Sequence, residues 1–166
     1  MTEIFDVVDE EDNVIGQATR QECHQKGLLH RAVHVLIFNS GGELLLQQRS
    51  LKMDTAPGYW TGSATGHVKS GDDYLETAHR ELGEDLGIKI DLHALGKVAC
   101  LLPEHMQMVK FFSGIHNGPF KIDLKELEKV EFVKIGKIKR DIRLTTRKFT
   151  PAFLEVFRKF CEVKRI

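Results

Sequence analysis

The chain has 166 residues, of which 42% are hydrophobic and 29% charged, and its 24 basic side chains balance 24 acidic ones. This length and composition predict one globular domain, 1–166, with enough apolar residues for a sizeable core. The lack of a basic excess argues against nucleic acid as the main partner.

The N-terminus and the cysteines bear on location. Residues 1–8 are acidic, and they lack the basic start and the long apolar run of a signal peptide or a membrane span. Cys23, Cys100 and Cys161 are odd in number and widely spaced, which is typical of reduced thiols. We therefore expect a cytoplasmic protein with no membrane partner.

The first third of the chain predicts four strands. Residues 4–8 and 14–18 are strand candidates on either side of a polar turn. Residues 33–38 and 44–48 flank Asn39-Ser40-Gly41-Gly42, which is a strong hairpin signal.

The middle of the chain predicts a helix over 74–86. Asp73 is followed three residues later by Glu76, a spacing typical of a capping box at a helix start. Gly87 stands where a left-handed residue would end the helix.

The remaining sequence predicts strands over 95–101, 106–115 and 130–135. Thr150-Pro151 then provides an N-cap and a first-turn proline before an amphipathic terminal helix. The order of elements predicts a mixed α/β fold in which a sheet lies between helices.

The helix over 74–86 carries an unusual acidic edge. Glu81, Glu84 and Asp85 stand at i, i+3 and i+4, where like charges repel one another. They lie beside a predicted apolar stripe of Leu75, Ala78, Leu82 and Leu86. Arg80 offsets part of the charge, and Mg²⁺ or Mn²⁺, which prefer oxygen ligands, would offset the rest. A solvated acidic face is the alternative.

The flanking residues favour the metal site. Residues 66–88, GHVKSGDDYLETAHRELGEDLGI, resemble the Nudix box: Gly, five residues, Glu, seven residues, then Arg-Glu-aliphatic-any-Glu-Glu-any-Gly-aliphatic. Asp72 and Asp85 stand where that family usually has Glu. The resemblance implies an α/β/α sandwich with a mixed sheet, and a metal-dependent hydrolase that cleaves a small-molecule diphosphate.

The resemblance also implies roles for individual residues. Glu81, Glu84 and Asp85 would be metal ligands, with the Gly66 carbonyl as an additional one. Arg80, Glu81 and Glu84 would form the catalytic set. Two residues would be structural, since an Asp72–Arg80 ion pair would brace the loop and Gly87 would end the helix.

A wider resemblance, from Phe5 to Phe157, is to the Nudix branch that includes isopentenyl-diphosphate isomerases. An isomerase is therefore an alternative function. The family's isomerases use a cysteine where this chain has Thr65 and an acid where it has Gln107, and neither side chain exchanges a proton readily at neutral pH. We therefore favour a hydrolase. A third hypothesis is a binding module with the same fold and no turnover.

The same branch implies a metal held by histidines, for which His24, His30 and His67 are the candidates. The alternative places His30 and His67 as hydrogen-bonded pocket residues and His24 at the surface. His34 alternates with valines on a predicted strand, so a core or opposite-face position is expected for it.

Other residues have two interpretations each. Arg49 and Lys52 are candidates for contacts with substrate phosphates or for a solvated surface. Trp60 would stack on a substrate group or brace a loop from inside the core. Glu104 is a candidate general base or an exposed acid. The sequence leaves the diphosphate substrate open, and a homodimer is compatible with it.

Overall fold

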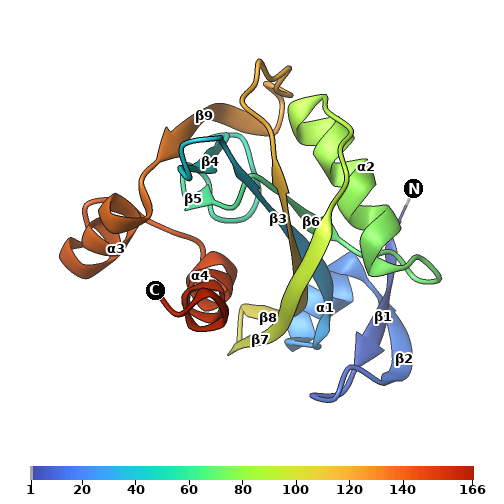
Figure 1. Ribbon diagram of the computed structural model, residues 1–166. Helices are drawn as coiled ribbons and strands as arrows, with labels where there is room; N and C mark the ends of the chain where they lie inside the picture. The colour runs from blue at the N-terminus through green and yellow to red at the C-terminus, as the bar shows by residue number, and fades with distance from the viewer. Residues whose placement is uncertain (1) are drawn as a thin grey trace.

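The protein is described by a computed structural model that covers residues 2–166 (Figure 1). The elements follow one another along the chain as β1 (Ile4–Val8), β2 (Val14–Thr19), α1 (Arg20–Lys26), β3 (His30–Phe38), β4 (Leu44–Arg49), β5 (Trp60–Thr61), β6 (Ala64–His67), α2 (Tyr74–Leu86), β7 (His93–Leu102), β8 (His105–Ile115), β9 (Leu127–Val133), α3 (Ile135–Leu144) and α4 (Pro151–Lys164).

Within residues 2–166, nine strands join in one mixed sheet with β3 at its centre. β3 pairs in parallel with β8 and antiparallel with β1, β4 and β6. β7 adds to β8 at one side, and β9 and β5 add to β4 at the other. Its position inside the sheet explains why β3 is an almost continuous apolar run, since both of its faces are covered.

Helices cover both faces of the sheet, α2 on one side and α4 on the other (Figure 1). Val33 and Val35 of β3 pack with Leu82 of α2 in one core. On the other face, Leu36 packs with Phe153 of α4 in a second core. The predicted α/β/α sandwich with a mixed sheet is therefore confirmed.

Helix α2 has the predicted bounds. The Asp73 carboxylate accepts a hydrogen bond from the Glu76 backbone N–H at 2.7 Å, and Gly87 ends the helix at a φ of +66°. The predicted apolar stripe was wrong at Leu75, which is 45% exposed. Leu75 points outward from the first turn, while Thr77 and Ala78 face the sheet.

Several elements were not predicted. α1 is capped by Thr19, which forms a complete capping box with Glu22, a four-residue signal that is present in the sequence. The strand expected over 130–135 is instead β9 over Leu127–Val133, and Ile135 begins helix α3. Among residues 2–166, none of the helices combines the length and the apolar composition needed to cross a bilayer.

Candidate active site

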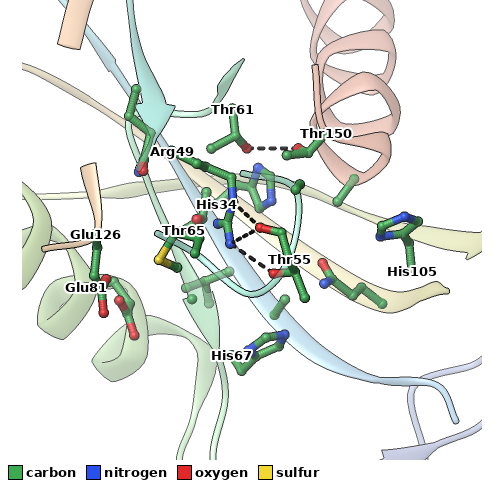
Figure 2. A pocket seen from close by; sticks show the side chains of 18 of the residues that line it. His34, Arg49, Thr55, Thr61, Thr65, His67, Glu81, His105, Glu126 and Thr150 are labelled. Carbon is green, nitrogen blue, oxygen red and sulfur yellow. Dashed lines mark hydrogen bonds between the residues drawn. The ribbon is translucent and has the colours of Figure 1, made fainter. Parts of the chain in front are cut away.

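A cavity of about 240 Å³ lies on β3, β4 and β6, between α2 and the start of α4. Figure 2 shows Glu81 and Glu126 at one end of it and His105 at the other, with Arg49 and His34 between them. The Nudix-like helix α2 therefore presents only part of the cavity wall, and the sheet provides much of the rest.

The three carboxylates of α2 occupy different environments. Glu81 and Asp85 are buried and line the cavity. The Glu84 side chain is 54% exposed and lies on the outer surface beside Lys52. The helical spacing thus places two acids at the cavity and one at its outer edge.

Asp85 is held firmly by one of its two oxygens. Its Oδ2 accepts hydrogen bonds from the Gln47 side chain at 3.2 Å and from the Thr65 N–H at 3.3 Å. Its Oδ1 is buried and has no partner within residues 2–166. Burial raises the pKa of Asp85 to about 7, although the bonds from Thr65 and Gln47 favour its charged form.

Glu81 lies directly against Gly66 of β6. A methyl group added at Gly66 would overlap the Glu81 carboxyl group, so a larger residue at this position would force the Glu81 side chain to move. Burial, followed by the negative charges of Asp85 and Glu84, raises the pKa of Glu81 to about 8. An ion of positive charge would stabilise the ionised form of both buried acids.

Arg80 pairs with acids of its own helix. Its guanidinium lies 3.3 Å from Glu81 and 3.7 Å from Glu84. The predicted Asp72–Arg80 ion pair is not formed within residues 2–166. Asp72 lies in the turn before α2, where its N–H donates to Lys69, and Arg80 is almost two helical turns farther along. Gly87 does end the helix as expected.

The three candidate histidines converge although they come from α1, β3 and β6. A ring nitrogen from each of His24, His30 and His67 lies within 4.8 Å of the others. The Nδ1 atom of His30 lies 2.8 Å from the Leu28 carbonyl oxygen, and its Nε2 atom is buried with no partner within residues 2–166. Burial lowers the pKa of all three, which favours the neutral imidazole that binds metals.

The structure separates the three substrate-binding candidates. Arg49 lines the cavity, and its guanidinium donates to the Thr55 carbonyl and hydroxyl oxygens at 2.9–3.1 Å. Lys52 points away to the outer surface. Trp60 is buried in the core, does not line the cavity, and has the Arg147 guanidinium carbon 4.3 Å from its ring centroid.

Two further acids, Glu104 and Glu126, line the cavity outside α2. Glu104, expected to be either a general base or an exposed acid, is exposed and also lines the cavity. Glu126, which precedes β9, also lines it, and no sequence pattern distinguishes it from the other charged residues of that segment. Burial, followed by the charges of Asp123 and Glu84, raises the pKa of Glu126.

Comparisons with known proteins agree with this architecture. Residues 28–153 match the model of the NUDIX domain. An uncharacterized Nudix hydrolase of Pseudomonas aeruginosa is 35% identical over 133 residues, which cover 80% of this chain and 79% of the relative. Isopentenyl-diphosphate Delta-isomerase 2 of Photorhabdus laumondii is 32% identical over 94% of this chain and 91% of its own.

A solved structure extends the likeness to the fold. A Deinococcus radiodurans protein superposes with a TM-score of 0.83 at 21% sequence identity, over 95% of this chain and 98% of its own. The domain match over 28–153 includes helix α2 and the strands β3, β4 and β6. The chain belongs to the Nudix family.

Proposed function

We propose that this protein hydrolyses a diphosphate linkage in a small molecule, using Mg²⁺ or Mn²⁺ held by Glu81, Glu84, Asp85 and the Gly66 carbonyl. The observation that carries the proposal is the pair of buried acids at the cavity, Glu81 and Asp85. Burial of two neighbouring carboxylates is unfavourable unless a cation or a proton compensates the charge.

The side chains fit a hard divalent cation. Asp85 offers a buried Oδ1 atom that has no hydrogen-bond partner within residues 2–166. Glu81 lines the same cavity and lies against Gly66. Glu84 would have to turn inward from its contact with Arg80 to join them. Oxygen donors of this kind are those that Mg²⁺ and Mn²⁺ prefer.

The chain's own residues can bind and orient the substrate. Arg49 has no carboxylate within 4 Å in the part of the chain that the structure describes, so its charge is available to a substrate phosphate. We assign to Glu126, which lines the cavity, the role of accepting a proton from the attacking water, with Glu104 of the same lining as the other candidate. A bound divalent cation would supply positive charge that offsets the diphosphate and makes nearby water more acidic.

Isomerisation of isopentenyl diphosphate to its allylic isomer is the alternative, because relatives that are 32% identical carry the isomerase name. Thr65 and Gln107 both line the cavity. By the family resemblance, Thr65 stands where the isomerases need a cysteine, and Gln107 stands where they need an acid. Neither side chain is suited to proton exchange at neutral pH. We therefore favour hydrolysis.

The test is phosphate release from a panel of diphosphate compounds with Mg²⁺ and with Mn²⁺. Glu84→Gln should lower the rate by roughly a hundredfold, since it removes a charged ligand. Glu76→Gln, a matched change at an exposed acid of the same helix, should have little effect. Equal rates in wild type and Glu84→Gln would count against the hydrolase and favour a binding module. Formation of the allylic isomer from isopentenyl diphosphate would support the isomerase.

We also infer that His24, His30 and His67 form a second metal site. Two observations support this second site. The Nε2 atom of His30 has no hydrogen-bond partner within residues 2–166, and the ring nitrogens of the three imidazoles lie close together. Cobalt absorption spectra should show a site that His67→Gln removes and that His93→Gln, at an exposed histidine of β7, retains. An unchanged spectrum in His67→Gln would assign the three rings to packing alone.

A further inference from the structure

The loop between β4 and β5, residues 50–59, runs along one side of the cavity. Two neighbours at its tip lie differently: Thr55 is half-buried and lines the cavity, whereas Asp54 is exposed. Within residues 2–166, two arginine side chains bond to this tip, Arg49 at the end of β4 and Arg20 at the start of α1. The tip therefore links α1 to the arginine of the proposed phosphate contact.

Thr55 holds the guanidinium of Arg49 by hydrogen bonds. The Nε atom of Arg49 donates to the Thr55 carbonyl oxygen at 3.1 Å. Its Nη2 atom donates to the same oxygen at 2.9 Å and to the Thr55 hydroxyl oxygen at 3.0 Å (Figure 2). These bonds use three of the five N–H groups of the guanidinium. The two N–H groups on Nη1 make no hydrogen bond within residues 2–166, so they remain for a phosphate oxygen.

Thr55 orients Arg49 without cancelling its charge, because both acceptor atoms are neutral. Burial lowers the pKa of Arg49 more than the charges of Asp54 and the cavity acids raise it. His34 of β3 gives no counter-charge, since burial, followed by the charge of Arg49, lowers its pKa to about 3. The neutral His34 ring has a buried Nδ1 atom with no partner within residues 2–166. Arg49 is thus held in one orientation while it keeps its attraction for an anion.

The loop tip is held in turn by α1. The guanidinium of Arg20 donates through Nη1 and Nη2 to the two carboxylate oxygens of Asp54, at 2.9 and 3.2 Å, which fixes both distance and direction. The Arg20 side chain is 31% exposed and that of Asp54 63%, so this pair contributes little to the stability of the whole fold. Ala56 has a left-handed φ of +44°, which is unfavourable for alanine, so contacts from outside the loop must hold the tip in this conformation.

We propose that Arg20, Asp54 and Thr55 are positioning residues for Arg49. The Arg20–Asp54 pair holds the loop tip, and Thr55 in that tip holds Arg49 in the orientation that binds a substrate phosphate. This inference rests on the proposed function, because the phosphate contact of Arg49 is taken from it. Without the pair, Arg49 would become ordered only when the substrate binds, and ordering a long side chain costs affinity.

The first measurement needs no substrate. In the metal-free protein, ¹⁵N relaxation of the Arg49 Nε–H group reports how far the guanidinium is ordered on the picosecond to nanosecond timescale. The order parameter should be high in wild type and fall below about 0.6 in Asp54→Asn and in Arg20→Gln. Asp54→Glu, which keeps the charge, should stay closer to wild type. Glu162→Gln breaks an exposed pair with Arg158 on α4, and this matched control should retain the wild-type value.

The second measurement is calorimetric binding of methylenediphosphonate, an uncleavable diphosphate, in excess Mg²⁺. Asp54→Asn and Arg20→Gln should each weaken binding by roughly two- to tenfold, the range for ordering one long side chain. Arg49→Gln should weaken binding more than either. Adding Asp54→Asn to Arg49→Gln should have no further effect, because Asp54 acts through Arg49. The urea midpoint of Asp54→Asn should match that of wild type, since the pair is exposed.

Several outcomes would overturn the inference. One is an Arg49 order parameter that is unchanged in both Asp54→Asn and Arg20→Gln, and another is additive losses of affinity from Asp54→Asn and Arg49→Gln. Tighter probe binding in Asp54→Asn would show that Asp54 withdraws Arg20 from the phosphate, and a lower urea midpoint would give the pair a role in the fold instead.

The measurements also separate this inference from the proposed function. Probe binding needs no cleavage, so the expected pattern in a protein that releases no phosphate would leave the positioning residues standing and reject the hydrolase. Phosphate release by a protein whose Arg49 stays ordered without the Arg20–Asp54 pair would reject the positioning residues alone. A wild type that fails to bind the probe would reject the phosphate contact of Arg49 and this inference with it.

Discussion

The carboxyl group of Glu81 occupies the space that a side chain at Gly66 would fill. Gly66 lies on β6 and Glu81 lies on α2, so the absence of a side chain at Gly66 leaves room for the Glu81 carboxyl group at the cavity wall. The glycine at the start of the Nudix-like segment therefore gives an acid of the proposed metal site the space that it occupies.

Gly66→Ala should displace Glu81 and weaken both the fold and cation binding. Overpacking a tight contact lowers the free energy of unfolding by about 1–3 kcal/mol. Urea unfolding and a calorimetric Mn²⁺ titration would measure the two effects.

Gly83→Ala is the matched control in α2, where the added methyl group meets no atom within 4 Å. It should stabilise the helix by about 1 kcal/mol. Wild-type Mn²⁺ affinity in Gly66→Ala would contradict the role given to this contact.

The raised pKa values of Glu81 and Asp85 predict that stability falls as the pH rises. They are raised from 4.5 to about 8 and from 3.8 to about 7, so the folded protein keeps protons that the unfolded chain has released. The free energy of unfolding must then decrease through that range. The buried histidines have the opposite effect below pH 6.5, because their pKa values are lowered. The acids therefore dominate between pH 6.5 and 8.

The measurement is urea unfolding at several pH values with EDTA. We expect a loss on the order of 2 kcal/mol between pH 6.5 and 8. Added Mg²⁺ should reduce that loss, since it compensates the ionised acids. Glu81→Gln should show a flatter profile than wild type. A wild-type stability that is constant or increases with pH in EDTA would show that these two acids are already ionised without a cation.

The buried position of Trp60 predicts a structural effect and no effect on the substrate. Trp60→Phe removes part of a buried ring and its contact with Arg147, so it should lower the free energy of unfolding by about 2 kcal/mol. The KM for a diphosphate substrate should stay within about twofold of wild type, because Trp60 is absent from the cavity lining. Tyr59→Phe, one residue earlier, controls for changes to the loop. A large rise in KM with an unchanged free energy of unfolding would indicate that Trp60 contacts the substrate.

The sequence predicted what local pattern determines. The sequence predicted the bounds of α2, its Asp73 cap, its Gly87 end and the N-cap at Thr150. Each of these features depends on residues within a few positions of one another. The convergence of the histidines depended on family resemblance. Helix α3 was missed because its start at Ile135 has no side-chain cap.

Features that arise from long-range packing were not predictable in the same way. Leu75 satisfies a helical stripe but faces solvent, because the direction of the helix on the sheet decides which stripe is buried. Glu126 reaches the cavity only because the loop before β9 folds beside α2, and no short motif marks it. The buried Nδ1 of His34 has no signature at all in an alternating strand.

Glu126 gives the most direct test of how the cavity works. If it accepts a proton from water, Glu126→Gln should lower kcat by on the order of a hundredfold or more while KM changes little, since the amide keeps the shape and cannot take a proton. Glu128→Gln, an exposed acid two residues later, is the matched control. Because burial raises the pKa of Glu126, the wild-type rate should begin to fall at a higher pH than it would with an ordinary glutamate as the base. A normal kcat in Glu126→Gln together with a loss in Glu104→Gln would transfer the role to Glu104, which lines the same cavity.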